Sequence, residues 1–541
     1  MRLIGTLLVL TSLAACTQAD SPETDVVVAG PSLFDPAELG TVNLPVSCND
    51  DASAGMEHGL ALLHHMAYTE ADLVFRSVLE DDPSCGMAYW GSAMTLIHPW
   101  WPDSPTGAEL DRGTALVEQA LDLGPKTDRE AGYINAVGAY FRGPRNRAEP
   151  ARLRSFFDGW RDVHERFPED WEATAFYVLA GATPSVGLVP RATGGDLMET
   201  LLGLVPDHPA GQHYLIHAYD TPAHASEALE VARNYGDLAP EVPHALHMPT
   251  HIYTQLGLWP ESVEANELSA AAALEQGPLV DGVDVAYGHP LGYLIYAYLQ
   301  RGQDTEAKAV RDRALAVEGP FGQLNLTTFA AHLAAIPVRY ALERHEWEEA
   351  TQLETRPAPA FPWDEGFTEY DAVTYFGRAM GHARSGSPGA AHEALDQLRT
   401  TLAATTGPLL TANGPSLLLS AEAWVTYSEG DEEAALATMM AAAEGSMSLT
   451  WAGLSEFLPA GELLADMYLD LGRHSDALAA YETVLQSQPG RLNSLCGAAR
   501  AAELAGDPGL ARSYYGMLDQ VTDPNSSRDC LVRARAFLGA G

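Results

Sequence analysis

A recurring pattern of small, bulky and proline residues constrains the fold of this chain more than any other feature. Three segments share a small residue, then a bulky residue four positions later, then an apolar residue after three more. They begin at Ala71, Ala477 and Ala511, and their bulky residues are Phe75, Tyr481 and Tyr515. Small residues let two helices cross closely, and the prolines that follow at Pro83 and Pro489 end a helix. The pattern therefore predicts repeated helix pairs near both ends of the chain.

The middle of the chain predicts the same unit in a looser form. YLQRGQDTEAKAV after Tyr293, YALERHEWEEA after Tyr340 and WVTYSEGDEEAALATM after Trp424 each indicate a helix, a short turn and a second helix. Gly302 and Gly430 mark the turns. Because each hairpin has an apolar stripe that it cannot cover alone, neighbouring hairpins must stack. We expect an all-α solenoid of about ten to twelve helix pairs.

This spacing resembles that of tetratricopeptide repeat proteins, over most of the chain from Gly55 to about Asp523. More narrowly, LLHHMAYTEADLVF, HYLIHAYD and HMPTHIYTQLGLW resemble a subgroup of exported bacterial lipoproteins with such repeats. The resemblance implies a fold and a location, and no activity. It also implies that seven histidines belong to motifs, whereas His65, His332 and His474 are incidental. The seven are His64, His98, His213, His217, His247, His251 and His289.

Histidine is concentrated in one window of the sequence, residues 208–259, which holds seven of the 18 histidines. His213 and His217 stand four apart in HYLIH, so on a helix they share one face and can hold one metal ion. His247 and His251 have the same spacing, but Pro249 interrupts them. We expect a helix to begin at Pro249, with His247 on the segment leading into it.

These patterns predict a transition-metal site of neutral imidazoles, which suit zinc or copper. The proposed residues are the seven motif histidines named above, with Asp220 as a ligand or as a hydrogen-bond acceptor behind a ligand. The alternative is that the histidines are core residues, each bonded to a carbonyl or a hydroxyl group.

The first residues of the chain predict export. MRLIGTLLVLTSLAAC has one basic residue, an apolar run and small residues before Cys16, which indicates a signal peptide over residues 1–15. The Leu13–Cys16 segment resembles a lipobox, which implies lipidation of Cys16; the alternative is an ordinary signal peptide. Residues 16–51 are predicted to be an anchor and a flexible tether, and residues 52–541 the solenoid with a C-terminal capping helix.

An exported chain favours disulfide bonds among its other four cysteines. Proximity in the sequence suggests Cys48 with Cys85 and Cys496 with Cys530, although the sequence alone allows three connectivities.

Charge and missing motifs narrow the function. The formal charge of -42 disfavours nucleic acid as a partner. The sequence contains no HExxH, GxSxG, GxxxxGK[ST] or GxGxxG motif that follows a strand. These observations favour a membrane-anchored protein that binds a peptide or protein on its concave face beside a histidine-rich metal site. The alternatives are a metal-dependent hydrolase or oxidoreductase in which Asp220 or Glu227 accepts a proton, and a metal-free scaffold that binds a peptide or protein.

Overall fold

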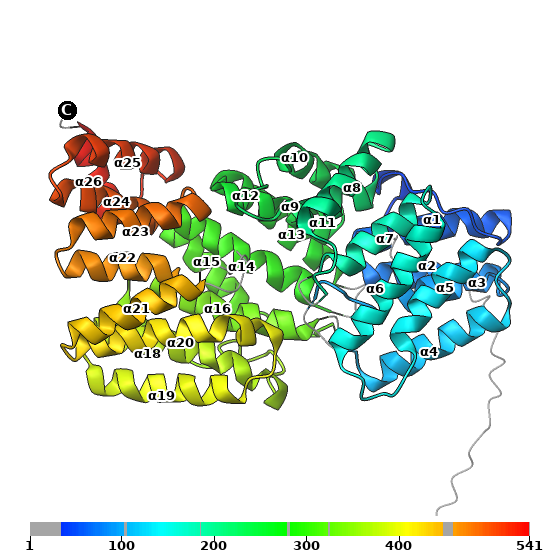
Figure 1. Cartoon of the computed structure of the whole chain (residues 1–541), viewed down its shortest axis with the longest axis horizontal. Coiled ribbons are helices and arrows are strands. Elements are labelled where there is room, and N and C mark those ends of the chain that lie inside the picture. The colour runs from blue at the N-terminus through cyan, green and yellow to red at the C-terminus, as the bar shows by residue number, and fades with distance from the viewer. Residues whose placement is uncertain are drawn as a thin grey trace, which may run out of the picture. The chain divides into compact units, whose positions relative to one another are not determined.

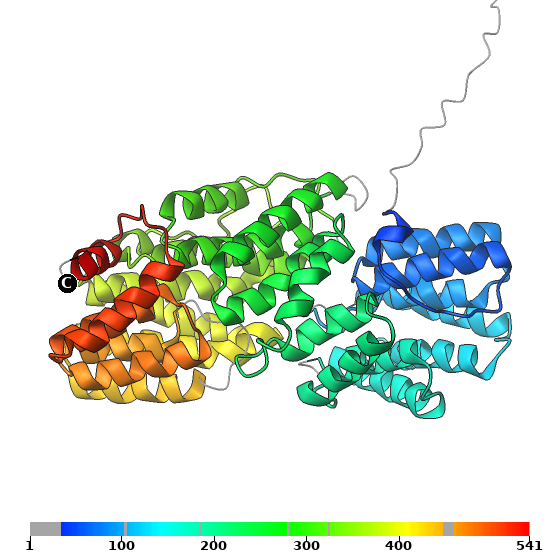
Figure 2. The ribbon, with the colours of Figure 1, turned by 90° about the horizontal axis from the view of Figure 1, so that it is seen from above.

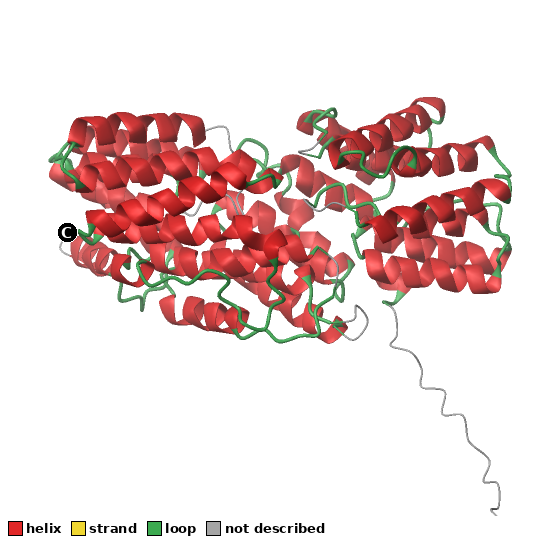
Figure 3. Cartoon of the chain, turned by 90° about the horizontal axis from the view of Figure 1, so that it is seen from below, coloured by secondary structure: helices red, strands yellow, loops and turns green. Residues whose placement is uncertain are grey.

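The computed structural model describes residues 34–101, 105–183, 186–277, 282–322, 325–446 and 458–539. Throughout these ranges the regular secondary structure is helical, and no strand is present beyond one isolated bridge between Val283 and Phe321 (Figure 3). Consecutive helices lie side by side, so that the colour changes gradually from each helix to the next (Figures 1 and 2). The predicted all-α fold of stacked helix pairs is confirmed.

The helices of the first half of the described chain are η1 (Pro36–Glu38), α1 (Asp50–His64), α2 (Tyr68–Asp81), α3 (Gly86–Met94), α4 (Gly107–Asp122), α5 (Asp128–Phe141), α6 (Glu149–Arg166), α7 (Trp171–Gly181), α8 (Arg191–Leu204), α9 (Pro209–Tyr219), α10 (Leu229–Leu238), α11 (Pro243–His247), α12 (Pro249–Leu256) and α13 (Trp259–Gln276). Those of the second half are α14 (Val285–Gln300), α15 (Asp304–Leu315), α16 (Leu326–Leu342), α17 (Trp347–Ala350), η2 (Glu365–Tyr370), α18 (Asp371–Arg384), α19 (Pro388–Ala404), α20 (Pro408–Ser428), α21 (Glu432–Ser446), α22 (Ala460–Asp470), α23 (His474–Ser487), α24 (Leu492–Leu504), α25 (Pro508–Val521) and α26 (Asp529–Gly539).

The repeat pattern works through bulky side chains that lie against glycines of neighbouring helices. The Phe75 ring of α2 fills the space beside Gly59 of α1 and Gly91 of α3, and Tyr481 of α23 fills the space beside Gly497 of α24. A Cβ at any of these glycines would overlap the ring, so the small residue is required by the packing. The bulky positions of the sequence pattern are therefore core positions.

The predicted turn glycines lie at helix ends, and two of the three predicted hairpins have two full helices. Gly302 and Gly430 have φ of 68° and 91°, the left-handed conformation that lets a helix end and the chain reverse. One hairpin differs: after α16 the second helix, α17, is a single turn. The chain then continues without helix to η2, which Asp364 caps.

Residues 34–49 differ from the predicted tether, because they pack against the helical body. Phe34, Leu39 and Leu44 are buried. The Asn43 N–H donates to Glu172 at 2.9 Å, and the Ser47 N–H donates to Glu130 at 2.7 Å. The composition predicts a linker because the segment has no helical period. In the structure its apolar residues are buried, and its backbone is hydrogen-bonded to distant helices. The predicted signal peptide, Cys16 and residues 16–33 lie outside the described residues.

Two disulfide bonds are present, one near each end of the described chain. Cys48 is bonded to Cys85, with Cα atoms 4.9 Å apart, and Cys496 to Cys530, with Cα atoms 6.0 Å apart. These are the pairings that proximity in the sequence favoured, and they agree with an extracytoplasmic protein. Among the described residues, no helix combines the length and the apolar character needed to cross a bilayer.

Candidate metal centre

Four helices bring the histidines of the central region together. α9 starts with His208 as N-cap and Pro209 at its first position, and it carries His213 and His217 one turn apart. α12 begins at Pro249, as predicted, and ends at Gly257, whose φ is 68°. The segment before it is itself a short helix, α11. α14 begins after its N-cap Asp284 and carries His289.

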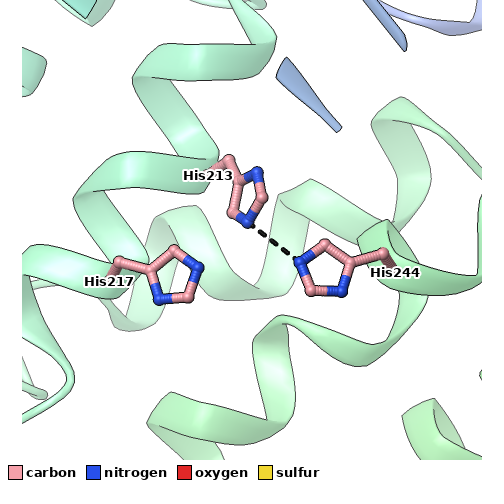
Figure 4. Close-up of side chains that lie close together, drawn as sticks. All are labelled: His213, His217 and His244. Atoms are coloured by element: carbon pink, nitrogen blue, oxygen red, sulfur yellow. Dashed lines mark hydrogen bonds between the residues drawn. The ribbon is translucent and has the colours of Figure 1, made fainter. Parts of the chain in front are cut away.

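The first group is the α9–α11 triad, formed by His213, His217 and His244. One ring nitrogen from each lies within 4.8 Å of the other two. Nε2 of His213 and Nε2 of His244 face each other at 3.2 Å (Figure 4). Nε2 of His217 is buried, and none of the described residues forms a hydrogen bond with it.

The second group is the α11–α14 triad, formed by His247, His251 and His289, whose ring nitrogens also lie within 4.8 Å of one another. Nε2 of His247 and Nε2 of His251 face each other at 3.3 Å. The two triads are adjacent: the ring centroids of His217 and His251 are 5.7 Å apart, and those of His244 and His247 are 6.3 Å apart. The six imidazoles therefore form one cluster.

The hydrogen bonds behind the second triad determine which nitrogens carry protons. Nδ1 of His251 donates to the Asp220 carboxylate at 2.8 Å. Nδ1 of His247 donates to Oδ1 of Asn266 at 2.8 Å, and the amide of Asn266 is oriented because its Nδ2 donates to the Ser262 carbonyl. With Nδ1 protonated in both neutral rings, each Nε2 presents a lone pair. The two lone pairs then point at each other across 3.3 Å, which is repulsive unless a cation lies between them.

Contacts behind the first triad also orient its imidazole rings. Nδ1 of His213 donates to the backbone carbonyl of His64 at 2.6 Å, so its Nε2 faces His217 and His244 with a lone pair. Trp100 stacks on the His217 ring at 4.2 Å. Such hydrogen bonds and stacking contacts fix the ring orientation, which is what supporting residues do at metal sites.

Burial keeps five of the six imidazoles neutral, which is the form that binds metal. It lowers the pKa of His213 to about 3 and that of His217 well below its usual 6.5. The pKa values of His244, His247 and His289 are also held well below 6.5, first by burial and then by neighbouring histidines. Protonating the cluster would therefore place several positive charges together in a buried space.

Asp220 provides the negative charge nearest to the second triad. Burial alone would raise the pKa of its carboxyl, but His251, the hydrogen bond from Gln255 and the Arg191 guanidinium lower it overall. Its oxygens accept from His251 Nδ1 and from the Gln255 amide at 2.9 Å. Asp220 thus occupies the acceptor position behind a ligand, one of the two roles that the sequence suggested.

A pocket of about 110 Å³ opens onto the cluster. Its wall includes His217, His247, His251 and His289 together with aromatic side chains such as Trp101. A water molecule needs roughly 10 to 15 Å³ measured in this way, so the pocket has room for several waters or one small molecule.

The structure separates the seven motif histidines into two groups. Five belong to the triads: His213, His217, His247, His251 and His289. His64 does not, because its nitrogens lie 3.0 Å from the Tyr214 hydroxyl and 2.9 Å from Glu172. His98 also lies outside both triads; its Nε2 is 3.0 Å from the Thr95 carbonyl oxygen.

Two histidines at this site were not among the predicted residues: one belongs to the cluster and the other lies against it. His244 belongs to the first triad, and its spacing of three from His247 is a helical signal that could have found it. His332 seemed incidental, yet its Nε2 lies 2.7 Å from Nδ1 of His289. No local signal in the sequence indicates His332, since α16 meets α14 only through the tertiary fold.

Comparisons with known proteins identify no family for this chain. No family profile and no curated protein sequence matches the chain. Among solved structures, yeast Tom70 is 12% identical with a TM-score of 0.34, covering 91% of this chain and 96% of that one. A human IFIT1 dimer with m7Gppp-AAAA is 12% identical with a TM-score of 0.36, covering 88% and 96%.

Proposed function

We propose that this chain is a metalloenzyme of the cell exterior, in which two histidine triads hold two zinc or copper ions beside a pocket for a small substrate. The observation that carries the proposal is the pair of facing Nε2 atoms of His247 and His251, 3.3 Å apart, whose Nδ1 atoms both donate to oxygen.

A proton shared between two rings is the simplest alternative to a metal ion, and the third ring of each triad argues against it. A proton links two nitrogens, whereas a transition metal links three or four. The His289 nitrogen converges on the same space as those of His247 and His251, and in the other triad His217 Nε2 is buried without a partner among the described residues. Three converging donors fit a metal ion better than a proton.

The donor set supports zinc or copper. All six candidate ligands are imidazoles, with no thiolate among them, and imidazole suits both metals. Structural zinc sites are closed by four protein ligands, whereas catalytic sites keep a position open. Three protein ligands for each ion, next to a pocket, therefore favour catalysis over a structural role.

The chain's own residues would orient the ligands and manage protons. When bound, zinc would polarise a substrate oxygen or activate a water, and copper would add electron transfer. Asp220 holds His251 in the tautomer whose Nε2 is free and stabilises positive charge that develops on its ring. The aromatic wall, including Trp100 and Trp101, limits the water near the cluster.

Metal content tests this proposal directly. Untagged protein dialysed against zinc or copper near pH 7.5 should retain close to two ions per chain, measured by inductively coupled plasma mass spectrometry. His247→Ala should retain about half of that, and His474→Ala, outside the cluster, should match the wild type. Copper would be distinguished by its electron paramagnetic resonance signal. Wild-type protein that retains no metal would refute the centre and leave the peptide-binding scaffold as the better hypothesis.

We also propose that Cys16 is lipidated and anchors the exported chain to a membrane. The proposal rests on the Leu13–Cys16 segment and is supported by the two disulfide bonds of the folded part. Cys16→Ser should move the protein from the membrane fraction to the soluble fraction. Unchanged fractionation would contradict lipidation at this cysteine.

A further inference from the structure

The pocket has a second polar region, where α2, α14 and α16 begin. Glu70 lies in the first turn of α2, and Asp284 is the N-cap of α14. Both carboxyl groups line the pocket, and the two residues are only 5% and 4% exposed. Oδ1 of Asp284 accepts from the Ala286 N–H at 2.9 Å. These carboxyl groups are not part of either histidine triad.

Neither carboxyl group is paired with a cation by the described residues. Burial raises the pKa of Glu70 to about 7, and the Asp284 charge adds to that rise. Burial likewise raises the pKa of Asp284 to about 6. Two neighbouring buried acids without a counter-ion are costly, and a cation in the pocket would relieve both burial and repulsion.

The N-terminal end of α16 adds two polar atoms that lack partners. Asn325 is 3% exposed; its Oδ1 accepts from the Thr328 N–H at 3.2 Å, which leaves Nδ2 as a donor. That Nδ2 and the hydroxyl of Thr328 form no hydrogen bond with any described residue. Both residues line the pocket, so a bound ligand would satisfy them.

We propose that this region binds the ammonium group of a small ligand that also carries an oxygen acceptor. Glu70 and Asp284 receive the ammonium hydrogens, and Asn325 Nδ2 and the Thr328 hydroxyl donate to the ligand oxygen. The nearby wall contains Tyr68, Trp101 and Tyr370, whose ring faces attract cations. The formal charge of -42 also raises the local concentration of cationic ligands.

This inference deepens the proposed function, since it gives the chemical class of the substrate that the metal centre would face. It can be tested without metal. We would titrate metal-free protein with 2-aminoethanol by isothermal titration calorimetry and compare two analogues of the same size. In 1-propanol a methyl group replaces the ammonium, and in propylamine a methyl group replaces the hydroxyl.

We expect 1-propanol to bind at least tenfold more weakly than 2-aminoethanol, and propylamine to bind with intermediate affinity. Glu70→Gln should weaken 2-aminoethanol at least tenfold, and because the amide resembles the protonated acid, the variant should fold. Thr328→Val should reduce the advantage of 2-aminoethanol over propylamine, because Asn325 Nδ2 would be the one remaining donor to the ligand oxygen. Asp466→Asn changes a half-buried carboxyl elsewhere in the chain whose pKa is also raised to about 7, so it is the matched control and should bind normally.

Equal binding of 2-aminoethanol and 1-propanol, or normal binding by Glu70→Gln, would overturn the ammonium site. The result is independent of the metal centre, because His247→Ala should lose about half of the metal and still discriminate among the three compounds. Wild-type protein that binds no metal but discriminates among the compounds would refute the proposed function alone. Wild-type protein that binds metal but does not discriminate would refute this inference alone.

Discussion

Two buried polar clusters lie in the same helical body, and they differ in how completely their hydrogen bonds are satisfied. In the cluster around Arg491, the guanidinium donates to Glu462 at 2.7 Å, to Glu343 at 2.9 Å and to the Tyr296 hydroxyl at 3.0 Å. Glu343 also accepts from Gln300 at 3.1 Å. Arg491 and both carboxylates are about 1% exposed, and opposite charges lie in direct contact.

The histidine cluster is less deeply buried, with His217 8% exposed and the His251 side chain 12% exposed, and it is left incomplete. His217 Nε2 and His332 Nδ1 have no partner among the described residues, and two pairs of Nε2 atoms face each other. A buried polar group costs free energy when it lacks a partner. The complete cluster around Arg491 can be explained by folding alone, whereas the incomplete histidine cluster needs a ligand to explain it.

The largest effect that we predict comes from breaking the complete cluster. Arg491→Met should lower the free energy of unfolding by roughly 3 to 5 kcal/mol, because Glu343 and Glu462 would stay buried without the guanidinium that both contact. Urea denaturation of metal-free protein would measure it. The matched change in the other cluster, His217→Ala, should cost the metal-free protein far less. Equal losses for the two variants would contradict the distinction between the clusters.

Metal should stabilise the protein through the incomplete cluster only. At a free metal concentration about 1,000 times the dissociation constant, binding to the folded state alone adds about 4 kcal/mol. Thermal unfolding with and without zinc or copper would show the shift, and a chelator should reverse it. His251→Ala should lose most of the shift, whereas His392→Ala, on an exposed surface, should keep it. A full shift in His251→Ala would rule out the second triad as the site.

The sequence predicted features within one helix or repeat better than contacts between distant helices. Local spacing placed the repeats, the helix that starts at Pro249 and the pair His213 and His217 on one face. It could not show that α16 brings His332 to His289, or that the Glu172 carboxylate is hydrogen-bonded to His64. Those contacts join residues far apart in the chain. Pairs within one helix are readable from spacing, whereas partners across helices depend on how the repeats stack.

Acid should destabilise the histidine-rich part of the molecule. Burial lowers the folded-state pKa of His65 to about 4, so between about pH 6.5 and 4 the unfolded chain binds a proton that the folded chain does not. Stability is therefore complete above pH 6.5 and falls as the pH drops toward 4, by about 3 kcal/mol for this residue.

Urea denaturation of metal-free protein between pH 7.5 and 4 would measure this loss. His65→Gln should flatten the pH dependence even if it lowers stability at pH 7.5, and His392→Gln should not change it. An unfolding free energy that stays constant from pH 7 to 4.5 would show that the buried histidines do not control acid stability.

The smallest effect that we predict concerns the support behind one ligand. Asp220→Asn should weaken metal binding by about tenfold to a hundredfold, which corresponds to roughly 1.4 to 2.7 kcal/mol. An amide carries no charge to stabilise the His251 ring when its Nε2 binds a cation. The amide can also donate to Nδ1, which would move the ring proton to Nε2 and block that nitrogen. Metal titration followed by competition with a chelator would measure the affinity, and Asp476→Asn, an exposed residue paired with Arg473, is the control. Since Asp220 does not itself belong to a triad, the variant should still bind the same number of ions, and a lower stoichiometry would instead make Asp220 a direct ligand.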